Sequence, residues 1–92
     1  METKTIYGIA WFNESDWEEW KRISQDEIED RYDEWLIEAS RGKEKLEKEG
    51  FIVKQVTITP ANFVAWCKKH NRRRDSSSRT QYVSELLEIV HS

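Results

Sequence analysis

The sequence is poor in cysteine and contains no long apolar run. Its only cysteine, Cys67, has no partner for an internal disulfide, and the opening METKTIYGIAWF lacks the basic segment, apolar run and cleavage site of a signal peptide. We therefore expect a cytoplasmic protein. No apolar run approaches the roughly 18 residues that a membrane-spanning helix needs, so we expect no membrane partner.

Apolar residues of every kind are scarce in this chain. They make up 37% of its 92 residues, whereas charged residues make up 36%, well above the roughly 25% of a typical soluble domain. A chain of this length has room for one domain, residues 1–92, with a modest core. Five tryptophans, three phenylalanines and three tyrosines compensate for the shortage, because each aromatic side chain buries about 150 to 250 Å² when it is enclosed. The sequence therefore predicts an ordered, aromatic-rich core rather than a disordered chain.

The charges are segregated along the chain, although the net charge is only −3. Residues 14–34 contain ten acidic and three basic side chains, which gives a net charge of −7. Residues 68–79 contain six basic side chains and one acidic side chain, which gives +5. The molecule is therefore expected to be electrically two-sided, which affects the approach of partners more than it affects the fold.

The N-terminal part of the chain predicts a strand and then a short helix. Residues 4–12 are rich in β-forming side chains that alternate between two faces, so we expect a strand that is covered on both sides. Ser15 and Glu18 fit the S-x-x-E capping box, in which each side chain accepts a hydrogen bond from a backbone N–H at a helix start. The helix that follows should end near Ser24.

The middle of the chain contains the clearest helical pattern. Apolar residues recur at helical spacing across residues 31–49, after an acidic connection. Gly50 fits the left-handed position that ends helices, and Leu46 and Phe51 lie where a Schellman motif makes its hydrophobic contact. The helix should therefore end at this glycine.

A second strand and two further helices are predicted after Gly50. Residues 51–59 are β-branched and short, as in a strand. Thr59 and Pro60 predict a helix start, with the threonine as N-cap and the proline in the first turn. The last helix is expected to begin near Ser78, which forms an S-x-x-Q capping box with Gln81.

The predicted order, β-α-α-β-α-α, indicates a helix-rich α/β (α+β) domain with a small two-stranded sheet packed by helices. Two strands are marginal as a sheet unless helices or further strands cover them. We therefore expect either helices across the sheet or a second copy of the chain that extends the sheet at an exposed edge, as in a homodimer. Parallel and antiparallel pairing both remain open at this point.

Four landmarks of the sequence, in this order, resemble small bacterial proteins of uncharacterised activity. They are WF at 11–12, YDEWL at 32–36, P-x-x-F-x-x-W-C at 60–67 and Y-V-x-E-L-L at 82–87. The resemblance covers nearly the whole chain. It implies a cytoplasmic, self-contained α/β domain, and it supplies no catalytic residues.

Cys67 and His70 are the residues whose spacing most suggests chemistry. They share one predicted helix face with Phe63 and Trp66, so they could bind a metal or form a nucleophile–base pair. A structural zinc site needs four ligands, however, and the only other histidine is His91. No motif indicates an oxyanion site. We therefore expect both side chains to pack on the inward face of the helix.

The acidic stretch at residues 26–34 and the tryptophans offer two further candidate sites. The carboxylates of the acidic stretch lack the glycine and the spacing of a calcium-binding loop, so we expect a solvated face and no metal or cofactor. Four tryptophans lie on apolar stripes that the core needs. Trp11 lies on the opposite strand face from Phe12, so it is the tryptophan that we expect to be partly exposed as a contact residue.

The basic segment is the main candidate binding site, and its residues are Lys68, Lys69, Arg72, Arg73, Arg74 and Arg79. These side chains could contact the phosphates of a nucleic acid, an acidic protein surface, or the acidic segment of a second copy. The low isoelectric point and the absence of a groove-reading motif count against nucleic acid. Our leading hypothesis is a small, soluble, non-catalytic binding or assembly module acting through protein contacts. The alternative is a nucleic-acid-binding accessory domain that uses residues 68–79.

Overall fold

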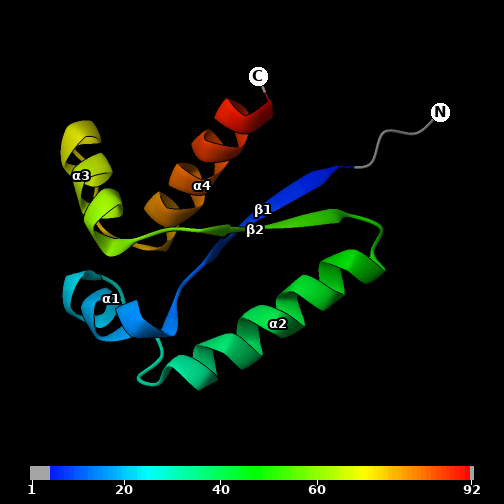
Figure 1. Ribbon diagram of the computed structural model, residues 1–92, viewed down its shortest axis with the longest axis horizontal. Helices are drawn as coiled ribbons and strands as arrows, with labels where there is room; N and C mark the ends of the chain where they lie inside the picture. Colours follow the sequence, from blue (N-terminus) through cyan, green and yellow to red (C-terminus); the bar gives the residue numbers. More distant parts are fainter. Residues whose placement is uncertain (1–4, 92) are drawn as a thin grey trace.

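Two parallel strands cross the middle of the molecule, with helices packed on both faces (Figure 1). This computed structural model describes the backbone of residues 5–91 and the side chains of residues 5–88. Its elements are β1 (Ile6–Trp11), the 3-10 turn η1 (Glu14–Asp16), α1 (Trp17–Ile23), α2 (Tyr32–Lys48), β2 (Ile52–Thr57), α3 (Pro60–His70) and α4 (Ser76–His91). The predicted order and fold class are confirmed. Lys4, which we assigned to the first strand, lies outside the described residues.

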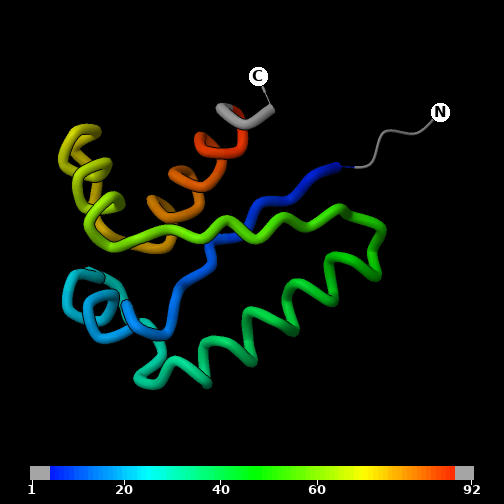
Figure 2. The backbone as a smooth tube through the Cα atoms, in the orientation of Figure 1, coloured from blue at the N-terminus to red at the C-terminus, as the bar shows by residue number. Residues whose placement is uncertain are grey.

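The sheet consists of β1 and β2 in parallel, a choice that the sequence left open. Its register runs from Ile6 opposite Ile52 to Trp11 opposite Thr57, and α2 forms the connection between the strands. Successive side chains of a strand point to opposite faces. Gly8 faces α4, where a Cβ atom would contact the side chains of Leu87 and Val83. α4 therefore covers one face of the sheet, and α2 lies on the opposite face, as the trace in Figure 2 shows.

The core gathers at the C-terminal end of the strands, where α1, α3 and α4 meet. The Phe12 ring lies 4.7 Å from Trp20 and 4.8 Å from Trp35, measured between ring centroids. The buried apolar residues of this core are Phe12, Trp17, Trp20, Ile23, Ile58, Phe63, Cys67 and Val83. The predicted aromatic-rich core is confirmed.

The end of α2 is the predicted Schellman motif. Gly50 has φ +96°, its N–H donates to the Glu47 carbonyl, and the Phe51 N–H donates to the Leu46 carbonyl at 3.1 Å. The same motif, which we did not predict, ends α3 at Asn71, a non-glycine residue with φ +55°. Asparagine tolerates this left-handed conformation better than most residues.

The helix starts differ from the prediction in two places. Ser15 lies within η1, and neither this turn nor α1 has a side-chain cap, so the predicted Ser15–Glu18 box is wrong. The last helix begins at Ser76 rather than near Ser78, because Asp75 is its N-cap and accepts a hydrogen bond from the Ser78 N–H at 3.1 Å. Ser78 is instead buried inside the helix.

Two further expectations concern α3 and the membrane. Pro60 occupies the first turn of α3 as predicted, and Thr59 is at the N-cap position, although its side chain makes no capping bond. None of the helices in the described part of the chain is both long and apolar enough to cross a membrane.

Candidate functional site

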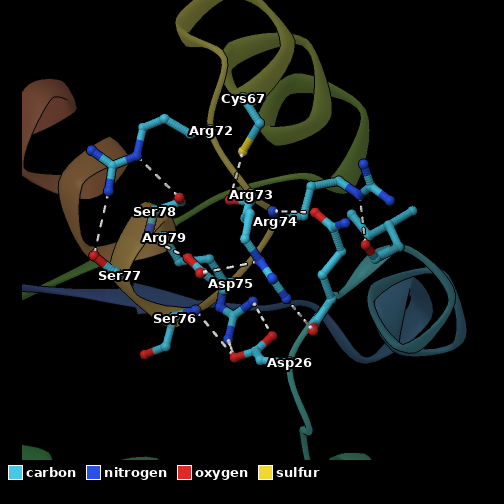
Figure 3. A network of polar contacts seen from close by, with 12 residues as sticks. Asp26, Cys67, Arg72, Arg73, Arg74, Asp75, Ser76, Ser77, Ser78 and Arg79 are labelled. Atoms are coloured by element: carbon cyan, nitrogen blue, oxygen red, sulfur yellow. Dashed lines mark hydrogen bonds and ion pairs between the residues drawn. The ribbon is translucent and has the colours of Figure 1, made fainter.

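The basic segment does not project from the surface as a free loop. The connection between α1 and α2 docks on the turn between α3 and α4 (Figure 3). The Gln25 N–H donates to the Arg74 carbonyl and the Arg74 N–H donates to Gln25 Oε1, both at 2.8 Å. We call this contact, residues 23–26 against residues 72–79, the polar clasp.

An ion pair between Arg79 and Asp26 lies at the centre of the polar clasp. The Arg79 guanidinium donates to the two carboxylate oxygens of Asp26 at 2.6 and 3.2 Å, and the two side chains are only 10% and 25% exposed. Asp26 also accepts a hydrogen bond from the Ser76 N–H at the first turn of α4, where the helix dipole favours a negative charge. The basic and acidic segments therefore meet within one chain.

The other arginines of the segment also donate to groups of their own chain. Arg74 Nε donates to the Ile23 carbonyl at 2.6 Å, and Arg73 donates to the Gln25 carbonyl at 3.1 Å. Arg72 donates to Ser78 Oγ and Gln81, and its guanidinium lies over the Trp66 ring. These contacts stabilise the fold.

Among the predicted basic contact residues, three keep well-exposed side chains. Lys68 and Lys69 are exposed in the last turn of α3, and the Arg73 side chain is 69% exposed. Arg72 and Arg74 are half-buried, and Arg79 is buried. The structure thus brings part of the predicted binding residues into the protein interior and leaves only a small basic surface.

Cys67 and His70 lie in different environments. Cys67 is buried, its thiol donates to the Arg73 carbonyl, and burial raises its pKa. His70 is exposed beside the Trp66 ring, so the expected inward position of His70 is wrong. The reason is its place in the last turn of α3, beyond the core. The side chain of His91 lies outside the described residues.

Trp11 is half-buried rather than freely exposed. Its ring packs edge-on against Trp35 of α2, with 5.0 Å between the ring centroids. Trp11 therefore anchors α2 to the face of the sheet opposite α4. A contact role for its remaining exposed surface stays a prediction.

The outer edge of β1 is open. The Ile52 and Ile58 N–H groups donate to the Thr5 and Trp11 carbonyls at 3.0 Å, so the odd-numbered residues of β1 turn their backbone groups toward β2. In a parallel pair this direction alternates along the strand. The N–H and C=O groups of Ile6, Gly8 and Ala10 therefore point away from β2, and no described strand pairs with them.

Within residues 5–12, β1 also lacks three of the features that protect open edges. Proteins blunt such edges with charged residues, proline or bulges. Residues 5–12 contain no charged residue and no proline, and the pairing has a continuous register, whereas β2 contains Lys54. Ile6 and Tyr7 are 42% and 46% exposed at the start of β1. This edge is a suitable template for another strand.

Two hollows run along the open edge and share Thr80 of α4. The first, about 540 Å³, is mainly apolar and lies between residues 5–8 of β1 and Ser84, Leu87 and Glu88 of α4. The second, about 310 Å³, lies beside Ala10 and Phe12, with Trp17 and Trp35 in its lining. We call the two hollows together the β1-edge groove.

Acidic side chains line both halves of the β1-edge groove. Glu88 lines the first hollow, and Glu27 and Glu29 line the second. Among the described residues, Arg79 is the one basic residue in the lining of either hollow, and it is paired with Asp26. The first half of the groove is thus mainly apolar and the second half more polar, and among the described residues unpaired acidic side chains line both halves.

The sequence patterns did not predict this groove, although an exposed strand edge was among the expectations. The uncharged run at residues 5–12 was the available signal. The facing wall comes mainly from α4, more than 60 positions later in the chain. Comparison of the chain with protein-family models, with curated proteins and with solved structures gave no match.

Proposed function

We propose that this protein is a small, non-catalytic binding module that holds an extended segment of a protein partner in the β1-edge groove. The observation that carries the proposal is the open, uncharged edge of β1 beside an apolar hollow of about 540 Å³. A segment that adds to a strand edge gains affinity from backbone hydrogen bonds and specificity from alternate side chains that enter the neighbouring groove.

The chemistry of the remaining residues supports binding rather than catalysis. The raised pKa keeps the Cys67 thiol protonated, and His70 lies outside the core in which the thiol is buried. The module is expected to act in the cytoplasm, where its single free thiol stays reduced.

The alternative nucleic-acid function has less support from the geometry. Arg72, Arg74 and Arg79 donate hydrogen bonds to the chain itself. Phosphate contacts by these three arginines would break bonds that hold the polar clasp.

The proposal can be tested with a display library of random seven-residue segments. We expect the protein to enrich segments with β-branched residues at alternating positions. Ser84→Trp should abolish the enrichment, because Ser84 is exposed in the wall of the groove. Ser40→Trp, at an exposed position of α2, is the matched control and should leave the enrichment intact.

A second readout follows the backbone of β1. An enriched segment should slow hydrogen exchange at the outward N–H groups of Gly8 and Ala10, and Ala10→Pro should weaken binding by removing one of them. Gln55→Pro removes an outward N–H from the other edge, on β2, and should leave binding unchanged. Equal loss in both proline variants, or no segment sensitive to Ser84→Trp, would reject the proposed function.

A further inference from the structure

The charges of the β1-edge groove restrict what its occupant can be. From the groove we propose that the partner segment is extended, apolar in the middle and basic at both flanks. This inference rests on the proposed function and specifies its ligand.

The length of the open edge sets the length of the segment. A strand advances about 3.3 Å per residue, so the edge from Thr5 to Phe12 accommodates roughly seven residues in register. Every second side chain of an added strand points toward α4. These side chains enter the mainly apolar hollow beside the contact between Gly8 and Leu87, which favours apolar residues of moderate size.

The two ends of the groove require positive charge. Glu88 lies beside the first half of β1, and Glu27 and Glu29 lie beside the second half. The Asp26 carboxylate at the second end is already neutralised by Arg79, so Glu27 and Glu29 provide the uncompensated charge there. Because both ends are acidic, a segment with basic flanks fits in either chain direction.

A second copy of this chain fits the groove less well. An antiparallel copy of β1 would direct its own acidic turn, Glu14–Asp16, toward the half of the groove that Glu88 lines. Like charges brought together in this way oppose association. The occupant is therefore a segment of a different protein.

Three display libraries with the same random five-residue centre test the inference. Their flanks are fixed as lysine, serine or glutamate at both ends. We expect lysine-flanked segments to bind at least tenfold more tightly than glutamate-flanked segments with the same centre. The difference should shrink at high salt, because exposed charges are screened.

Charge reversal identifies the responsible residues. The triple variant Glu27→Lys, Glu29→Lys and Glu88→Lys should invert the preference toward glutamate flanks. The matched control, Glu34→Lys, Glu38→Lys and Glu44→Lys on exposed positions of α2, should keep the lysine preference despite the same change in net charge.

The possible outcomes separate this inference from the proposed function. Equal binding of all three flanks, lost in Ser84→Trp, would overturn the charge inference and leave the proposed function standing. The absence of any binding sensitive to Ser84→Trp would overturn both. Self-association in sedimentation equilibrium that Ala10→Pro abolishes would assign the groove to a second copy and overturn the inference as well.

Discussion

Arg79 of α4 donates two hydrogen bonds to the carboxylate of Asp26, which lies 53 positions earlier in the chain. This pair joins the most acidic and the most basic segments of the sequence. It also fixes the α1–α2 connection against the first turn of α4. The arginine cluster is therefore part of the folded framework, and the open edge of β1 is the better candidate for a binding surface.

Removal of Asp26 should destabilise the protein strongly. We expect Asp26→Ala to lower the free energy of unfolding by about 3 kcal/mol, at the lower end of the range for a broken buried pair, because Asp26 is partly exposed. Urea unfolding followed by circular dichroism measures the change. Glu38→Ala removes an exposed pair with Arg41 and should cost no more than about 0.5 kcal/mol. Equal effects of the two variants would contradict a structural role for the polar clasp.

Gly8 should not tolerate a side chain. A Cβ atom at this position would overlap Leu87 and lie 3.1 Å from Val83 Cγ1, so Gly8→Ala should cost about 1 to 3 kcal/mol through overpacking. Gly42 faces open space in the middle of α2, so Gly42→Ala should stabilise the protein by about 0.5 to 1 kcal/mol. Thermal unfolding of the two variants, compared with wild type, measures both shifts. A neutral Gly8→Ala would indicate that α4 packs less closely on β1 than described.

Acid should weaken the start of α4. The hydrogen bond from the Ser78 N–H lowers the pKa of Asp75, so protonation opposes the folded state. The contribution of Asp75 is present above its unfolded pKa, about 3.9, and is lost as the pH falls through the lower folded pKa. Asp75→Asn keeps a capping side chain and should flatten the loss of stability below about pH 4. Urea midpoints between pH 5 and pH 2 test this, with Glu44→Gln on α2 as control; parallel curves for Asp75→Asn and wild type would contradict it.

The thiol of Cys67 should react slowly in the folded protein. Burial blocks access and raises the pKa, so thiolate is scarce at neutral pH. We expect an aromatic disulfide reagent at pH 8 to react about 100-fold more slowly with native protein than with denatured protein. The variant with Cys67→Ser and Ser40→Cys carries an exposed thiol and should react rapidly in both states. Fast reaction of native Cys67 would show that α3 opens readily.

Nucleic-acid binding should be weak and only modestly dependent on salt. Three basic side chains of the segment remain well exposed, Lys68, Lys69 and Arg73. Three phosphate contacts on single strands predict a slope of log affinity against log salt of about −2. Fluorescence anisotropy with labelled single-stranded RNA and DNA at several salt concentrations measures the slope. A slope near −4, with loss of binding in a variant lacking Arg72 and Arg74, would favour the nucleic-acid function instead.

The local features of the fold were predictable because they depend on neighbours in the sequence. Gly50 ends α2 through bonds between residues no more than five positions apart, and Pro60 starts α3 through its own fixed backbone. The capping boxes predicted at Ser15 and Ser78 were wrong because local sequence alone does not choose the capping residue. Several polar residues compete at each helix start, and the surrounding packing selects among them.

The candidate site was less predictable because its parts are far apart in the chain. The inward position expected for His70 assumed that the apolar face of α3 is covered along its whole length. The arginines could be listed from the sequence, but their partners come from the α1–α2 connection. The wall of the β1-edge groove comes from the last helix.

By itself, the sequence determined which segments become strands and helices, the aromatic composition of the core and the segregation of charge. These properties follow from periodicity, turn residues and composition, which act over a few positions. Only the tertiary structure decided that the strands pair in parallel, that Arg79 turns inward to Asp26, and that β1 keeps an open edge beside α4. Each of these depends on which distant surfaces bury one another, and that choice is made by the packing of the whole chain.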